Sequence, residues 1–200
     1  MIDTIIFDLS EVYLNGILGI ENRLVPILGI KNPKEIHLRL EGDKFWDYMH
    51  GKISENEYWT KTLEENKWPL TLDTLKELAR KNFQEIPGTR GIIESLKNQG
   101  HKLGLLSVHG QEWIDYCEEK FDYHKLFDEI SYSFQEGVSK PNKKAYEIIL
   151  RKLKADPKKT IFTDDSRKNI EAARNLGINA IRFENPKQLI EELKKFGVCI

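Results

Sequence analysis

The chain has 200 residues, 40% of them hydrophobic and 32% charged, which is typical of a folded globular protein and excludes a disordered one. Lysine and arginine (31) nearly balance aspartate and glutamate (32), so the formal charge of −1 argues against a nucleic-acid partner. No apolar run approaches the roughly 20 residues of a membrane span, and the N-terminal residues do not form a signal-peptide pattern. The spacing of Cys117 and Cys199 fits neither a zinc site nor a disulfide framework, so we expect a cytoplasmic protein without a membrane partner.

The first half of the chain combines one strand with a long helical segment. Residues 4–7 (TIIF) predict a buried strand, because they are apolar on both faces and β-branched or aromatic. A loop with two glycines follows. Helical patterns then dominate, and they lie at 20–30, 33–51, 54–66 and 72–83. Ser54 and Glu57 form a capping-box pattern that predicts the start of the third helix.

Strands and helices alternate after Pro87 and Gly88. We expect strands near 101–107, 129–133, 160–165 and 178–183, and helices over 89–100, 111–121, 142–153, 166–177 and 186–196. Such alternation is typical of a parallel sheet covered by helices on both faces. The predicted fold class is therefore α/β, with a Rossmann-like parallel-sheet core (residues 1–14 and 87–200) and an inserted all-helical cap (residues 15–86).

Polar residues stand where several predicted strands end. Asp8 follows the first strand, Ser107 ends the second, and Asp164 and Asp165 end the fourth, while Lys140 lies just before a helix. Ligands of an open parallel sheet bind beyond the carboxyl ends of its strands. Carboxylates gathered there repel one another, which favours a hard cation such as Mg²⁺. A lysine and a hydroxyl beside the cation suit a dianionic phosphoryl group.

These segments resemble, in order, the four motifs of the haloacid dehalogenase (HAD) superfamily. That family carries Asp-x-Asp after its first strand, Ser or Thr after the second, Lys before a helix, and an acidic pair after a further strand. The resemblance rests on the segments FDLSEV, LLS, SKPN and FTDDSRKNIEAARNLG, which span nearly the whole chain. It implies a HAD-like hydrolase with a helical cap, namely a Mg²⁺-dependent phosphatase that acts on a small phosphorylated substrate.

The resemblance also implies catalytic roles. Asp8 is the nucleophile that forms an aspartyl-phosphate. Ser107 and Lys140 bind the substrate: Ser107 donates a hydrogen bond to the transferring phosphoryl group, and Lys140 bridges this group and the nucleophile.

The implied metal ligands are Asp8, the main-chain carbonyl of Ser10 and Asp165, with Asp164 acting through water or Lys140. Asn169 stands where the family often has a further polar residue.

Ser10 departs from the family pattern. In phosphatases of the family the second Asp of the first motif is the general acid/base, and a hydroxyl is far too weak an acid to replace it. General acid/base help is worth about 10²–10⁴-fold, so we expect slow turnover of substrates with poor leaving groups. Glu11 and His109 are candidates for the missing acid, and the sequence does not decide between them.

Other interpretations remain open at this stage. Asp8 could cap a strand end, and Ser107 could be the N-cap of the helix over 111–121. The protein could be a binding or regulatory member that turns over little, or a metal-independent 2-haloacid dehalogenase, although the acidic pair argues against the latter. The sequence identifies neither the substrate nor the oligomeric state, monomer or dimer.

Overall fold

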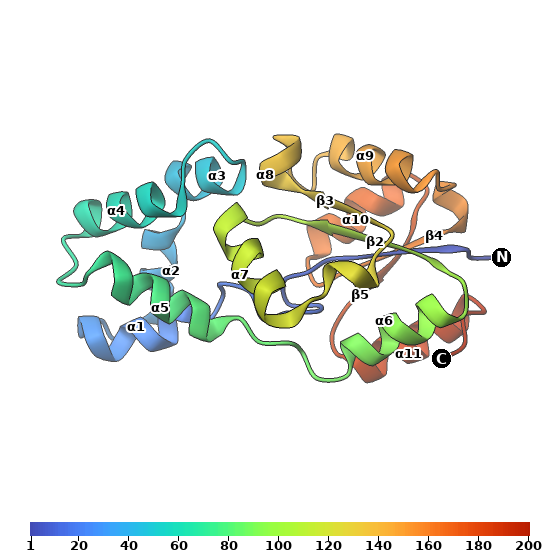
Figure 1. Cartoon of the computed structure of the whole chain (residues 1–200), viewed down its shortest axis with the longest axis horizontal. Coiled ribbons are helices and arrows are strands. Elements are labelled where there is room, and N and C mark those ends of the chain that lie inside the picture. Colours follow the sequence, from blue (N-terminus) through green and yellow to red (C-terminus); the bar gives the residue numbers. More distant parts are fainter.

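The computed structural model describes residues 1–200 and contains one sheet of five parallel strands (Figure 1). The strands are β1 (Thr4–Phe7), β2 (Lys102–Ser107), β3 (Glu129–Tyr132), β4 (Thr160–Asp164) and β5 (Asn179–Arg182). Their order is β3-β2-β1-β4-β5, so the first strand of the chain lies at the centre of the sheet. The predicted α/β fold class is confirmed.

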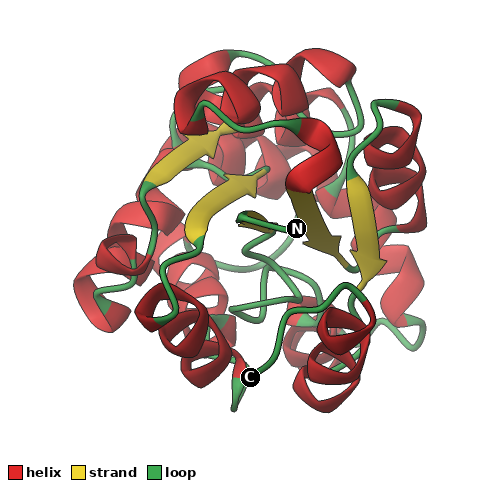
Figure 2. Ribbon diagram, turned by 90° about the vertical axis from the view of Figure 1, so that its right-hand side faces the viewer, coloured by secondary structure: helices red, strands yellow, loops and turns green.

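Helices cover both faces of the sheet (Figure 2). The helices α6 (Thr89–Asn98) and α11 (Pro186–Lys195) lie below the strands in Figure 1, whereas α9 (Lys143–Leu153) lies above them and packs with α10 (Arg167–Asn175). Successive side chains of a strand point to opposite faces, so Ile5 and Phe7 join the larger core cluster while Ile6 joins the smaller one with α9 and α10. Burial on both sides explains why β1 is apolar throughout.

The second half of the chain contains four further helical elements. They are α7 (Gln111–Phe121), the short α8 (Ser133–Glu136), and two 3₁₀ turns, η1 (His124–Leu126) and η2 (Pro157–Lys159). The strand expected over 129–133 ends one residue early, because Ser133 already begins α8.

Five helices lie between β1 and α6, beyond the carboxyl ends of the strands (Figure 1). They are α1 (Ile20–Leu28), α2 (Pro33–Leu40), α3 (Asp43–Met49), α4 (Glu55–Asn66) and α5 (Leu72–Asn82). The helical pattern over 33–51 is interrupted at Gly42, whose φ of 100° is incompatible with a continuing helix. The capping box of Ser54 and Glu57 is confirmed at the start of α4. No helix is both long and apolar enough to cross a membrane.

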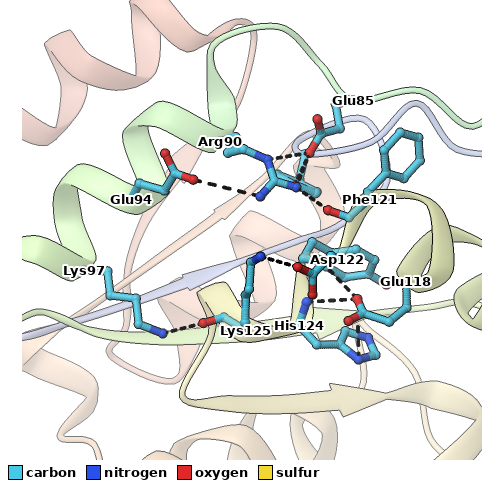
Figure 3. Close-up of polar contacts among 11 residues, drawn as sticks. Glu85, Arg90, Glu94, Lys97, Glu118, Phe121, Asp122, His124 and Lys125 are labelled. Carbon is cyan, nitrogen blue, oxygen red and sulfur yellow. Dashed lines mark hydrogen bonds and ion pairs between the residues drawn. The ribbon is translucent and has the colours of Figure 1, made fainter.

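The two segments that join these helices to the sheet run side by side. Asn15 N donates to Gln84 O (2.8 Å), and Ile86 N donates to Tyr13 O (2.8 Å). The second segment also contacts the rest of the chain (Figure 3). Arg90 of α6 contacts Glu85 of this segment and donates to the carbonyl of Phe121 at the end of α7. The inserted helices therefore leave and rejoin the sheet at one place, a few residues after Asp8.

On the opposite side, α3 packs directly against the first turn of α7. The ring of Tyr48 lies over Gly110, the residue before α7, and a Cβ atom at this glycine would overlap the ring. Tyr48 also meets the indole of Trp113 edge to face, with 4.9 Å between ring centroids. Gly110 is thus required for the close approach of the two segments and not for its backbone angles, which any residue can adopt.

We expect Gly110→Ala to lower the free energy of unfolding by about 1–3 kcal/mol, because the rigid Tyr48 ring must move. Gly91→Ala is the matched control, since Gly91 lies on the exposed side of α6 with open space around it and alanine should stabilise the helix by about 0.5–1 kcal/mol. Urea unfolding of both variants measures the difference. Equal effects of the two substitutions would contradict the close packing.

Candidate active site

Three carboxylates meet at the carboxyl ends of the two central strands. Asp8 follows β1 directly, while Asp164 ends β4 and Asp165 comes next. The two strands pair in parallel with Phe7 beside Thr163, which brings the acids to the same level. One oxygen of each carboxylate lies within 4.8 Å of the others. A set of close carboxylate oxygens without nitrogen or sulfur fits a hard divalent cation such as Mg²⁺.

The ammonium group of Lys140 lies between two of these acids. Its Nζ is 2.8 Å from Asp8 Oδ1 and 2.7 Å from Asp164 Oδ2, and the side chain is buried. Burial by itself lowers the pKa of Lys140, but the Asp164 and Asp8 carboxylates outweigh it, so the pKa lies above its usual value. Lys140 is therefore a permanently charged group at the centre of the site.

Asp8 is held through one carboxylate oxygen. Its Oδ1 accepts from Leu9 N (2.6 Å) as well as from Lys140, which leaves Oδ2 without a hydrogen bond. Burial raises the pKa of Asp8, Lys140 opposes the shift, and the charge of Asp164 adds to it. Burial and Asp164 likewise raise the pKa of Asp165. A single ammonium group does not offset the mutual repulsion of three carboxylates, and a divalent cation would relieve it.

Asp164 is the most tightly held of the acids. Its Oδ1 accepts from Ser166 N (2.8 Å), and Nδ2 of Asn169 lies 3.0 Å from each carboxylate oxygen. Asn169, whose role the sequence left open, therefore orients the acid that in turn holds Lys140. Asp164 also bonds the amide of Ser166, the residue before α10, although no side chain caps this helix.

Ser107 ends β2, the strand next to β1, and its buried Oγ has no hydrogen-bond partner. The interpretation as an N-cap is wrong, because Gly110 occupies the N-cap position of α7 and no side chain caps this helix. A buried hydroxyl without a partner is uncommon. An unpartnered donor beside the Asp8 strand is what a bound oxyanion would satisfy.

The loop after Asp8 carries Ser10 and Glu11. Glu11 has a left-handed backbone (φ 59°), and its carboxylate accepts from Gly16 N (2.8 Å). Burial is the main cause that raises the pKa of Glu11, Gly16 opposes it, and the charge of Asp165 adds to it. The Ser10 side chain lies against Gly16, and its main-chain carbonyl accepts no hydrogen bond from another main-chain amide.

His109 lies away from this cluster of charges. Its ring is buried against Phe83 and Trp113, at centroid distances of 5.8 and 5.7 Å, and its Nδ1 has no hydrogen-bond partner. Burial lowers the pKa of His109 to about 4, so the imidazole is neutral near pH 7.

The structure thus brings Asp8, Lys140, Asp164 and Asp165 into one cluster, with Ser107 on the adjoining strand. The main-chain amide of Leu9 also contacts the site, and sequence reasoning missed it because a backbone donor has no residue signature.

The sheet is parallel and carries a lysine between acids at its carboxyl edge, and helices are inserted after its first strand. Together these features define a Rossmann-like hydrolase. The chain belongs to the haloacid dehalogenase-like hydrolases, since the sequence model of that family matches residues 5–183.

Two solved structures share the fold of this chain. A HAD family enzyme from Bacteroides thetaiotaomicron, in complex with magnesium and inorganic phosphate, is 20% identical with a TM-score of 0.78, over 94% of this chain and 99% of that one. A HAD-like family hydrolase from Porphyromonas gingivalis is 23% identical with a TM-score of 0.77, over 98% of both chains. These two likenesses concern the fold alone.

Among curated relatives, a phosphorylated carbohydrates phosphatase from Thermotoga maritima is 30% identical over 99 residues, which are 50% of this chain and 46% of that protein. This chain matches about half of the length of its curated relatives, or less.

The depressed pKa of His109 predicts acid sensitivity. Its ordinary pKa of 6.5 applies to the unfolded chain and about 4 to the folded one, so the unfolded state binds more protons in between. The free energy of unfolding should therefore fall as pH drops from about 6.5 to 4, by up to about 3 kcal/mol from this group. In His109→Gln this part of the slope should disappear in denaturant unfolding, and NMR of the wild type should record a neutral ring down to about pH 4. An unchanged slope would contradict the prediction.

Proposed function

We propose that this hydrolase is a Mg²⁺-dependent phosphatase that acts on a small phosphorylated metabolite through an aspartyl-phosphate at Asp8. The observation that carries the proposal is the buried Lys140 ammonium, 2.8 and 2.7 Å from Asp8 and Asp164. A fixed positive charge beside a carboxylate with one free oxygen suits attack on a phosphoryl dianion, because it offsets repulsion between nucleophile and substrate.

In the first step, the free oxygen of Asp8 attacks phosphorus while the bond from phosphorus to the leaving oxygen breaks. Lys140 stabilises the negative charge of the phosphoryl oxygens, and the unpartnered Ser107 hydroxyl donates a hydrogen bond to one of them. In the second step, water attacks phosphorus and the bond between phosphorus and the Asp8 oxygen breaks. The proton that the water loses passes to the released phosphate or to solvent, and Asp8 is again a carboxylate.

Asp8, Asp165 and the main-chain carbonyl of Ser10 are the residues that would hold Mg²⁺, with Asp164 acting through Lys140 or a water molecule. The close carboxylate oxygens support this set. The ion would supply positive charge next to the phosphoryl oxygens.

The leaving oxygen has no evident proton donor. Ser10 is too weak an acid, and His109 is neutral near pH 7 and buried among aromatic rings. Glu11 is half-buried in the adjoining loop, with its carboxylate bonded to Gly16. We therefore propose fast turnover only for leaving groups that need no protonation, such as aryl and acyl phosphates.

We further propose that residues 15–86 act as a cap that covers the site and selects the substrate. Their helices lie beyond the carboxyl ends of the strands, where Asp8 stands. The Thermotoga maritima relative, a phosphorylated carbohydrates phosphatase, supports a phosphorylated small molecule as the substrate class.

The nucleophile is tested by Asp8→Asn, which should reduce Mg²⁺-dependent hydrolysis of an aryl phosphate by at least about 10³-fold, because an amide does not attack phosphorus. Asp3→Asn is the matched control, since Asp3 lies exposed just before the same strand and should leave the rate unchanged. Retained activity in Asp8→Asn would refute the proposal. A wild-type protein without turnover, but stabilised thermally by phosphate and Mg²⁺, would favour the binding or regulatory protein.

The missing acid is tested by Ser10→Asp. This substitution should raise kcat/KM, which reports the first step alone, by about 10²-fold for an alkyl phosphate and much less for an aryl phosphate, because only the alkoxide requires a proton. Ser10→Asn is the size-matched control without an acid and should leave the ratio of the two rates unchanged. Equal gains on both substrates would exclude leaving-group protonation as the defect.

A further inference from the structure

A polar surface cleft lies between the inserted helices and the start of α7. The turn from α3 to α4 lines one side of it, and the first residues of α7 line the other (Figure 1). Its volume of about 530 Å³ lies within the range of pockets for small ligands. None of the residues placed in the candidate active site lines this cleft, so the proposed phosphatase does not account for it.

The side chain of Tyr48 lines the cleft and carries a hydroxyl without a partner. Tyr48 is only 1% exposed, and its hydroxyl makes no hydrogen bond within the protein. The hydroxyl lies next to Gly110, since a Cβ atom at this glycine would be 2.5 Å from it. It is therefore directed at the α7 side of the cleft, which Gln111 and Glu112 form. A buried hydroxyl seldom lacks a partner, so this one points to a ligand.

Tyr48 offers this ligand a donor and not a negative charge. Burial raises the pKa of Tyr48, and the charges of Glu55 and Glu112 add to this shift. The Arg80 guanidinium and the amide of Trp113 oppose it only in part. The hydroxyl therefore stays protonated, and it requires a hydrogen-bond acceptor on the ligand.

The first turn of α7 supplies further donors at the same place. This helix has 11 residues and no side chain caps it, so the amides of its first turn lack an intrahelical or capping partner. The facing helix α4 differs, because Ser54 and Glu57 form a capping box at its start. The unused donors are therefore concentrated on the α7 side of the cleft, beside the Tyr48 hydroxyl.

The charges of the cleft disfavour an anion, which helix N-termini otherwise attract. Two carboxylates, Glu57 and Glu112, face a single ammonium group, Lys52, which is already paired with Asp47 (2.8 Å). Each of the two carboxylates uses one oxygen for main-chain amides and keeps the other as an acceptor. The cleft thus presents uncharged donors on one side and carboxylate acceptors nearby. A hydroxyl group suits both, because it donates and accepts through the same atom.

We propose that this cleft is a second binding site, which takes a neutral polyhydroxyl molecule such as a sugar or a sugar alcohol. The Tyr48 hydroxyl and the amides of α7 donate to hydroxyl oxygens of the ligand, and Glu57 and Glu112 accept from its hydroxyl hydrogens. The proposal goes beyond the phosphatase and does not depend on it, because the ligand carries no phosphoryl group.

The site is tested by NMR titration of the isotope-labelled protein with sorbitol and with glucose. We expect the amide shifts to concentrate at residues 51–54 and 110–113. The Kd should be on the order of 1 mM, because hydrogen bonds to a neutral ligand largely replace bonds to water. Absence of these shifts with both sugars would overturn the proposal.

Tyr48→Phe and Tyr58→Phe form a matched pair of variants. The two buried rings stack on each other with 5.4 Å between centroids, and each substitution removes one hydroxyl and keeps the ring. Only Tyr48 lines the cleft, whereas the Tyr58 hydroxyl donates to Leu40 O (3.0 Å). Tyr48→Phe should weaken sugar binding about fivefold, the factor for one neutral hydrogen bond. Tyr58→Phe should leave it within about twofold of wild type.

Folding does not obscure this comparison. The Tyr48 hydroxyl has no partner in the protein, so its removal should not lower Tm, whereas Tyr58→Phe loses a hydrogen bond and should lower it. Unchanged affinity in Tyr48→Phe, or an equal loss in both variants, would overturn the proposal.

Two further outcomes would overturn the assigned ligand or its place. Sulfate that shifts the amides of residues 110–113 at lower concentration than the sugars would mean an anion site. Sugar-induced shifts centred on Leu9 and Lys140 would place the ligand in the candidate active site. Hydrolysis of an aryl phosphate is measured separately. Its absence, with sugar binding that depends on Tyr48, would refute the phosphatase and support the second site.

Discussion

The rest of the site depends on the burial of the Lys140 ammonium group between Asp8 and Asp164. Removing a charge from water costs several kcal/mol, and this cost is met only when partners are close and well oriented. Asn169 and the amide of Ser166 orient Asp164, which then bonds Lys140, which bonds Asp8. With Asp165, three carboxylates surround one ammonium group, and burial and mutual repulsion raise the pKa of Asp8 and Asp165. A divalent cation would relieve this repulsion.

The sheet order makes this arrangement possible. Because β1 lies at the centre, its neighbours β2 and β4 bring Ser107 and Asp164 to either side of Asp8. Parallel strands end at one edge of the sheet. Ser107 and Asp164 therefore lie level with Asp8, although they follow it by about 100 and 156 positions in the chain. The inserted helices follow Asp8 in the chain and lie beyond this edge, so the loop that carries Ser10 connects the sheet to them.

The serine at position 10 affects only one part of the proposed chemistry. The groups that neutralise and position a phosphoryl dianion are present, whereas a carboxylic acid for the leaving group is not at its usual position. The structure distinguishes the two alternatives for that acid by their surroundings. His109 is surrounded by aromatic rings and neutral, while Glu11 faces the charge of Asp165 and is bonded to Gly16 N.

Most secondary structure was predictable from the sequence, because hydrophobic periodicity and capping signals are local. The order of strands and helices after Pro87 and the capping box of Ser54 are examples. The periodicity over 33–51 did not indicate the break at Gly42, since the residues on either side continue an apolar pattern. The order of polar residues at strand ends, together with the family resemblance, also determined which residues to consider for the site.

Only the tertiary structure decided how these residues are surrounded. Ser107 could have capped α7, yet its hydroxyl is buried without a partner. Glu55 follows a capping serine, and α5 and α7 bury it and supply donors to its carboxylate. His109 could have been a proton donor, yet Phe83 and Trp113 exclude water from its ring. The reason is common to all three: burial and charge pairing depend on segments far apart in the chain, and a local pattern carries no information on them.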